Sequence, residues 1–187
     1  KAIADYTKAI ELDPNDARAY YNRGRVYQAR GEAEKAIADY NKAIELDPNR
    51  EITYYYRGIA YYGLGDYEKA IADHTKAIEL DPNYAHAYSA RGMVYQHRRE
   101  AEKAIADLDK AIELEPNRRI TYYYRGKAHA ALDEIEKAIA DYTKAIELNP
   151  NFADAYYNRG LAFQNRGETE KANMDFAKAK ELRYEPE

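Results

Sequence analysis

A fixed period of 34 residues is the feature that most constrains how this chain can fold. The period is marked by one proline in each unit: Pro14, Pro48, Pro82, Pro116 and Pro150. The pentapeptide Lys-Ala-Ile-Ala-Asp keeps the same interval and begins at Lys1, Lys35, Lys69, Lys103 and Lys137. A period of this length is typical of stacked repeat units, each of which buries its apolar face against its neighbours.

Within one unit the apolar residues follow a helical period. Those of the segment Lys35–Leu46 are Ala36, Ile37, Tyr40, Ala43, Ile44 and Leu46. This spacing places them on one face of a helix. Gly31 precedes that segment and is a good helix stop. The Asp-Pro-Asn run at Asp13–Asn15 ends one helix and starts the next, because Pro cannot continue a helix and Asn is a favoured cap.

A common numbering, with the recurring Pro at position 32, shows which residue types return in every unit. Position 4 is aromatic, as Tyr20, Tyr54, Tyr88, Tyr122 and Tyr156. Position 8 is Gly, as Gly24, Gly58, Gly92, Gly126 and Gly160. Positions 20 and 27 are Ala throughout, and position 11 is an aromatic residue or His. This pattern resembles the tetratricopeptide repeat, over the whole chain.

The resemblance implies an all-α fold, a right-handed α-solenoid of 34-residue helix-turn-helix repeats. We expect a single array over residues 1–187, beginning with the second helix of an incomplete repeat at 1–16. The full repeats are then 17–50, 51–84, 85–118, 119–152 and 153–187. This division predicts eleven helices, one from the half repeat and ten from the five full repeats, and no strand.

Two recurring features predict how the helices of a repeat meet. Gly inside a helix costs about 1 kcal/mol relative to Ala, so the Gly at position 8 indicates a close approach, which we expect to involve the small residues at positions 20 and 27. Arg recurs at position 7 and Asp at position 23, as in Arg23 and Asp39. An unpaired Arg would be costly to bury there, so we expect Arg–Asp ion pairs between the helices.

No constellation of side chains points to catalysis, to a metal or to a cofactor. The four histidines, His74, His86, His97 and His129, never share the spacing of a helical metal site. His74 and His129 stand where other repeats carry aromatic residues, so we expect them in the core. Ser89 is the only serine, and the sequence has neither a Gly-rich phosphate loop nor a nucleophile-elbow motif. The chain is therefore predicted not to be an enzyme.

Composition argues against two classes of partner. The net charge of −4 gives no electrostatic reason to expect nucleic acid or an anionic membrane surface. No apolar stretch of about 18 residues is present, so no membrane-spanning helix is expected. The chain has no Cys and no signal-peptide pattern, and we favour a cytoplasmic location.

Tyrosine is abundant, with 21 residues, and several lie outside the packing pattern. In the tetratricopeptide repeat family, first-helix positions 2, 5, 9, 12 and 13 line a concave groove. By that resemblance the groove of this chain is lined by Tyr21, Arg25, Gln28, Tyr55, Ile59, Tyr62, His86, Met93, Gln96, Tyr123, Lys127, Tyr157, Leu161 and Gln164. Tyr offers a large contact area with a hydrogen-bonding tip. The leading hypothesis is a scaffold or adaptor that holds a peptide or protein partner in this groove.

Two alternatives remain open at this stage. One is a self-assembly module that stacks end to end as a homo-oligomer through its uncapped N-terminal half repeat, where Ile3 and Ile10 would lack cover. At the other end Asn173 and Lys180 replace recurring Ile and make the last helix polar, as a terminal cap requires. The second alternative is a regulatory array that belongs to a larger enzyme.

Overall fold

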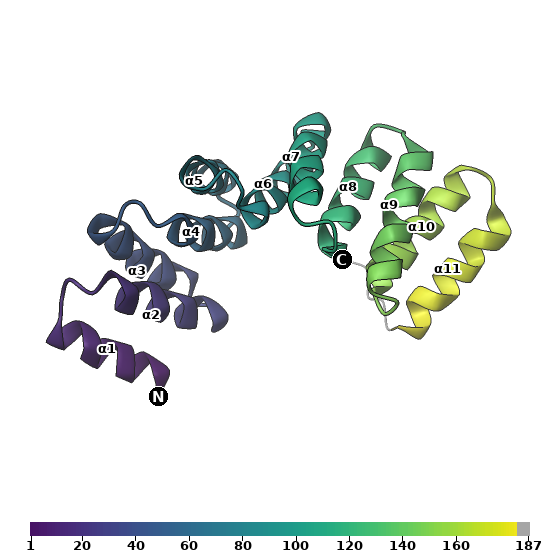
Figure 1. Cartoon of the computed structure of the whole chain (residues 1–187). Coiled ribbons are helices and arrows are strands. Elements are labelled where there is room, and N and C mark those ends of the chain that lie inside the picture. Colours follow the sequence, from purple (N-terminus) through teal and green to yellow (C-terminus); the bar gives the residue numbers. More distant parts are fainter. Residues whose placement is uncertain (183–187) are drawn as a thin grey trace. The chain divides into compact units, whose positions relative to one another are not determined.

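The computed structural model describes residues 1–182, and this part of the chain is entirely helical apart from its turns (Figure 1). It contains eleven helices, which are α1 (Ala2–Leu12), α2 (Ala17–Ala29), α3 (Ala33–Leu46), α4 (Glu51–Gly63), α5 (Tyr67–Leu80), α6 (Ala85–His97), α7 (Ala101–Leu114), α8 (Arg119–Ala131), α9 (Ile135–Leu148), α10 (Ala153–Asn165) and α11 (Thr169–Glu181). The predicted all-α solenoid of helix pairs is confirmed. Residues 183–187, the end of the fifth predicted repeat, lie outside the described residues.

The helices form two compact units, Lys1–Val94 and the residues from Tyr95 onward. The boundary falls inside α6, so a helix runs through it. In the first unit α1 to α4 each pack against the next helix in sequence. In the second unit α7 to α10 each do the same, with the most extensive packing between the two helices of one repeat. The single array over 1–187 stays a prediction.

Two of the turns between repeats are held by the Asp that opens the Asp-Pro-Asn run. Asp13 Oδ1 accepts a hydrogen bond from the backbone N–H of Asn15 at 3.0 Å, and Asp81 does the same for Asn83 at 2.9 Å. The helix cap is the following residue, where Asp16 accepts from the backbone N–H groups of Arg18 and Ala19. The expectation that Asn caps the helix is therefore wrong. The preceding Asp closes the turn first and leaves the next residue at the helix start.

Glycine at position 8 is required by an aromatic ring from the partner helix. A Cβ on Gly126 would lie 2.7 Å from a ring carbon of Tyr142, and one on Gly58 would lie 2.6 Å from His74. The close approach is thus confirmed, but the residue that fills it is chiefly the ring at position 24. Position 20 lies close as well, since such a Cβ on Gly24 would also lie 3.2 Å from the Ala36 carbonyl oxygen.

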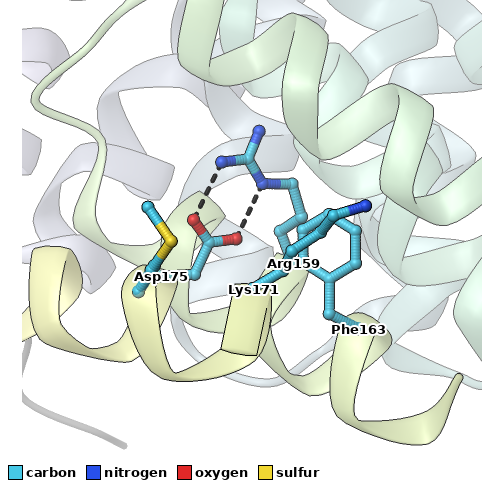
Figure 2. A pocket seen from close by; sticks show the side chains of 5 residues that line it. Arg159, Phe163, Lys171 and Asp175 are labelled. Atoms are coloured by element: carbon cyan, nitrogen blue, oxygen red, sulfur yellow. Dashed lines mark hydrogen bonds and ion pairs between the residues drawn. The ribbon is translucent and has the colours of Figure 1, made fainter. Parts of the chain in front are cut away.

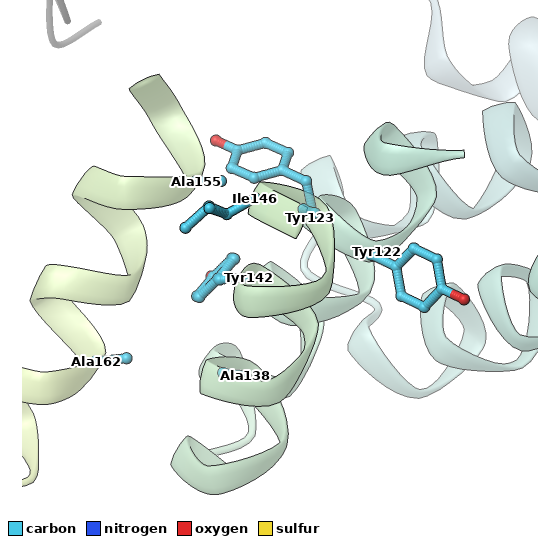
Figure 3. Packing of buried hydrophobic residues seen from close by; sticks show 8 residues of the cluster. Tyr122, Tyr123, Ala138, Tyr142, Ile146, Ala155 and Ala162 are labelled. Carbon is cyan, nitrogen blue, oxygen red and sulfur yellow. The ribbon is translucent and has the colours of Figure 1, made fainter. Parts of the chain in front are cut away.

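The largest core cluster lies in the second unit and shows what the repeat buries (Figure 3). Tyr142 and Ile146 of α9 lie between helices α8 and α10. Small residues from the neighbouring helix, Ala155 and Ala162, complete the cluster. Burying large apolar side chains stabilises by about 1.5–3 kcal/mol each, so stacking of successive repeats supplies most of the stability.

The recurring arginine at position 7 joins three helices. Arg57 of α4 donates from Nε and Nη2 to the Asp73 carboxylate of α5 at 2.7 and 2.6 Å. Its Nη1 donates to Asn41 Oδ1 of α3, in the preceding repeat, at 2.7 Å. The same three bonds recur at Arg23, Arg125 and Arg159, with Thr7, Asp109 and Thr143 as acceptors in the preceding helix. The prediction of Arg–Asp pairs is confirmed for these four repeats.

The acceptor in the preceding helix escaped the sequence analysis. It stands at position 25, where Thr7, Asn41, Thr75, Asp109 and Thr143 recur. Arg91 also donates to Thr75, at 2.9 Å. The remaining pair, Arg91 with Asp107, combines residues of the two units and stays a prediction.

Replacing Arg57 by Met should lower the free energy of unfolding by roughly 3 kcal/mol, because the buried Asp73 carboxylate loses its partner. The double variant Arg57→Met/Asp73→Leu should lose clearly less, since it leaves no buried charge unpaired. Urea unfolding followed by circular dichroism measures both. Equal losses in the single and double variants would show that the ion pair itself, and not the unpaired charge, sets the stability.

His74 takes the place of the position-24 aromatic ring and is fully enclosed. Its exposed fraction is 0%, and neither ring nitrogen has a hydrogen-bond partner among the described residues. Burial lowers the pKa of His74 to about 3, and the nearby cation of Arg91 acts in the same direction. The expected core placement is confirmed for His74. His129 is also buried, with Nδ1 at 2.6 Å from Glu134 Oε2.

The buried neutral imidazole makes the stability depend on pH. The pKa of His74 is about 3 in the folded chain and about 6.5 when unfolded, so between these values the unfolded chain binds one more proton. The free energy of unfolding should therefore fall by about 1.4 kcal/mol per pH unit as pH drops from 6 to 4. The variant His74→Tyr carries the residue that other repeats have at this position, as in Tyr40 and Tyr142. Its free energy of unfolding should lack this dependence on pH. Parallel pH profiles for the two proteins would contradict this.

Candidate functional site

The predicted groove residues fall on the first helices of the repeats and divide between the two units. The first unit carries Tyr21, Arg25, Gln28, Tyr55, Ile59, Tyr62, His86 and Met93. The second unit carries Gln96, Tyr123, Lys127, Tyr157, Leu161 and Gln164. Each unit therefore presents its own part of the predicted site.

A continuous run of aromatic rings crosses the first-helix side of the first unit. The Tyr55 ring centre lies 5.2 Å from that of Tyr56, 5.3 Å from Tyr84 and 6.1 Å from His86. Tyr56 in turn lies 5.8 Å from Tyr21. These distances are those of edge-on aromatic pairs, which stabilise beyond simple burial. Tyr55 and His86 of the predicted set are thus direct neighbours. Tyr56, which the set did not include, connects Tyr55 to Tyr21.

Two arginines lie against the end of this run, and with Tyr21 and Tyr56 they form what we call the paired-arginine cluster. The Arg25 guanidinium carbon lies 4.8 Å from the Tyr56 ring centre and 5.9 Å from that of Tyr21. The Arg50 guanidinium carbon lies 4.4 Å from the Tyr21 ring centre. These are cation–π distances. The Arg25 side chain is exposed, whereas Arg50 is half-buried.

The second unit has a similar aromatic cluster, in which Lys127 takes the place of Arg25. Tyr123 packs 5.0 Å from Phe152 and 5.3 Å from Tyr124, measured between ring centres. The Lys127 Nζ atom lies 5.7 Å from the ring centres of Tyr123 and Tyr124. Lys127 is thus the cation of this part of the predicted site.

Two predicted groove tyrosines are largely enclosed. Tyr21 is 3% exposed and packs with Tyr40, whereas Tyr123 is 9% exposed and belongs to the core cluster of the second unit. Each can offer a ligand only the rim of its ring. Tyr55, Tyr62 and Tyr157 are half-buried and present more surface.

The amide and aliphatic members of the set also differ in their surroundings. Gln28 Oε1 accepts a hydrogen bond from the Tyr40 hydroxyl at 2.7 Å, so this amide serves the core. Gln96 has the same repeat position, but its Oε1 is buried without a hydrogen-bond donor among the described residues, because Leu108 replaces the tyrosine. Leu161 and Gln164 are exposed, and Ile59 and Met93 are half-buried.

Sequence reasoning missed Arg50, Tyr56 and Tyr84 as neighbours of the site. Arg50 and Tyr84 stand at position 34, where the first repeat boundary has the capping residue Asp16. A large cationic or aromatic residue at a capping position was the available signal. Tyr56 follows Tyr55 directly, but it stands at position 6, which is not among the groove positions that were taken from the family.

Shallow pockets lie at the C-terminal helix pair. One is lined by Arg159, Phe163, Lys171, Met174 and Asp175, and the Arg159–Asp175 ion pair occupies its wall (Figure 2). None of these residues belongs to the predicted groove. Among the described residues no group of three acidic, His or Cys side chains could hold a metal ion. None of the described helices has the length and apolarity needed to cross a membrane.

The two terminal helices differ in what they leave uncovered. Helix α1 has no buried residue, and its Leu12 is 77% exposed. Helix α9 has the identical sequence over Lys137–Leu148, yet it buries Tyr142 and Ile146. In α11 the polar replacements Asn173 and Lys180 are exposed. The apolar face at α1 is thus open in the described chain.

Comparison with protein families matches most of the chain. A family model described as TPR repeat matches residues 1–31, 24–65 and 126–167. Three models described as tetratricopeptide repeat match residues 52–84, 85–118 and 153–186. No curated protein sequence matches the chain.

Several solved structures are similar over nearly the whole chain. MamA is 32% identical, with 86% of this chain and 94% of that chain covered and a TM-score of 0.77. MamA from Desulfovibrio magneticus RS-1 is 26% identical, with 89% and 94% covered and a TM-score of 0.81. YrrB, described as a TPR protein with an unusual peptide-binding site, is 29% identical, with 95% and 91% covered and a TM-score of 0.75.

The repeat signature, the paired helices and the matches agree with one another. Family models cover more than half of the chain. The fold and its neighbours support a protein-interaction scaffold, of a family that is typically non-catalytic. The chain belongs to the tetratricopeptide repeat family.

Proposed function

We propose that the chain is a scaffold that binds a peptide segment of a partner protein along its first-helix surfaces. The observation that carries the proposal is the aromatic run of the first unit, where half-buried Tyr55 packs edge to face with half-buried Tyr56 and Tyr84. Rigid aromatic side chains give contact area at low entropic cost, which suits recognition of a peptide. The similarity to YrrB, whose description names a peptide-binding site, supports the same function.

The test is site-specific crosslinking to a peptide probe. Peptides are first selected on the wild-type protein from a phage-displayed random library. A photoreactive phenylalanine analogue is then placed at Tyr62 or Leu161, on first helices, or at Lys76 or Lys144, on the exposed faces of second helices. We expect crosslinks from Tyr62 or Leu161 and none from Lys76 or Lys144.

Truncation gives an independent readout on the same peptides. Tyr62→Ala should weaken binding about tenfold or more while helical content stays unchanged, because interface tyrosines often dominate affinity. Tyr123→Ala is unsuitable, since it would open a cavity in the core cluster. Crosslinks at Lys76 or Lys144 would move the site to the second helices, and a library without any enriched peptide would reject peptide binding.

The open face of α1 favours self-assembly as a second candidate function. The same sequence in α9 buries Ala138, Tyr142, Ala145 and Ile146, whereas α1 buries none of its residues. Exposed apolar faces of this kind mark interaction sites. A second copy of the chain would cover the face by packing a helix against it.

Sedimentation velocity over a range of concentrations tests this candidate. Self-assembly through α1 predicts a mass that rises with concentration and a monomer for Ile10→Lys, whose counterpart Ile146 is buried. Ala4→Lys, on the exposed side of α1, is the matched control and should assemble like the wild type. A wild-type protein that stays monomeric at every concentration would eliminate this candidate.

A further inference from the structure

We propose that the paired-arginine cluster of the first unit binds the carboxylate groups of an acidic peptide segment. The inference rests on the proposed peptide-binding function and adds the chemical class of the ligand. Arg25, the exposed member, would contact the carboxylate directly, and Arg50 would hold positive charge behind it. The Arg25 guanidinium packs against the rings of Tyr21 and Tyr56, and the Arg50 guanidinium packs against the ring of Tyr21.

These two arginines form no ion pair within the described chain. Neither Arg25 nor Arg50 makes an ion pair with a carboxylate of the described chain. The position-7 arginines behave differently, as Arg57 and Arg125 each bind an Asp through two hydrogen bonds. Arginine favours bidentate binding of carboxylates, so an unpaired couple is available for a ligand.

The duplicate of Arg50 in the second unit does find a partner. Arg118 Nη1 lies 3.4 Å from Glu115 Oε2. The residue at the same repeat position before Arg50 is Asp47, which is one methylene shorter and forms no such ion pair. Arg25 itself is replaced by Met93 at the corresponding position. Two arginines on one tyrosine ring are therefore seen in the first repeat, whereas in the second unit Lys127 lies over Tyr123 and Arg119 over Phe152.

Apart from its contact with the Tyr21 ring, Arg50 satisfies no structural hydrogen bond through its Nη1 group. It occupies the capping position of α4, but its side chain makes no capping hydrogen bond. Its Nη1 group is enclosed without an acceptor among the described residues. Leaving a charged donor in this state destabilises the fold, and an anionic ligand nearby would offset that loss.

No carboxylate of the described chain forms an ion pair with the cluster. Burial raises the pKa of Tyr21, so its phenol is neutral at neutral pH. Glu51, in the first turn of α4, is the acidic side chain whose charge reaches the aromatic run, where it helps to raise the pKa of Tyr84. It forms no ion pair with either arginine.

The size of the cluster selects a peptide over a polyanion. Two cations can hold one or two carboxylates, whereas nucleic acid binding depends on many phosphate contacts. The net charge of −4 does not oppose this, because interactions between exposed charges are screened beyond about 8 Å at physiological ionic strength. The adjacent run of tyrosines would take apolar or aromatic residues that flank the acidic one in the peptide.

The experiment compares peptides selected from one phage-displayed random library on the wild-type protein. We expect an Asp or Glu in common among them, and a loss of affinity of about tenfold to a hundredfold when it is changed to Asn or Gln. Arg25→Met, which installs the residue of the corresponding position Met93, and Arg50→Gln should each cause a similar loss. Arg30→Gln, an exposed charge at the end of α2, is the matched control and should bind like the wild type. Thermal unfolding followed by circular dichroism verifies that every variant is folded.

The outcomes separate this inference from the proposed function. Enriched peptides that crosslink at Tyr62 but lack a common acidic residue would leave peptide binding intact and overturn the carboxylate site. Acidic peptides that bind the Arg25→Met and Arg50→Gln variants as tightly as the wild type would overturn it as well. A library without any enriched peptide would reject both.

Discussion

The contact between the glycine of the first helix and the ring of the second helix sets the distance between the two helices in four repeats. A side chain larger than hydrogen on Gly24, Gly126 or Gly160 would meet the facing aromatic ring below 3 Å. The two helices therefore approach until the ring edge touches backbone. This spacing brings the position-7 arginine, one residue before the glycine, within reach of the Asp beside that ring.

The arginine then ties each repeat to the one before it. Arg57 and Arg125 bind the carboxylate of their own second helix and an oxygen atom of the preceding second helix. Successive repeats thus share polar bonds as well as an apolar interface, although the apolar interface supplies most of the stabilisation. Such a bond also defines the register of neighbouring helices, because a bidentate guanidinium tolerates little displacement.

The same close packing decides which aromatic residues remain for recognition. Tyr40 and Tyr142 fill the position-24 site, and Tyr21 and Tyr123 lie against them. What reaches the surface is the next layer, which includes Tyr55 and Arg25 of the first unit. Position 9, where Arg25 stands, differs in every repeat, as Arg25, Ile59, Met93, Lys127 and Leu161, while the stacking residues recur.

The sequence by itself determined the eleven helices, the family and the Arg–Asp pairs, because a strict 34-residue period repeats every packing position five times. It placed His74 in the core for the same reason. The tertiary structure alone revealed that Tyr21 is enclosed, that Gln28 serves the Tyr40 hydroxyl, and that Arg50 lies over Tyr21. It also showed Arg99 and Asp133 in the left-handed conformation that Gly31 adopts at the same turn, with φ of 62°, 60° and 74°. These features depend on contacts between helices. The repeat period determines on which face of its helix a residue lies, but it does not determine which side chain of a neighbouring helix covers that residue.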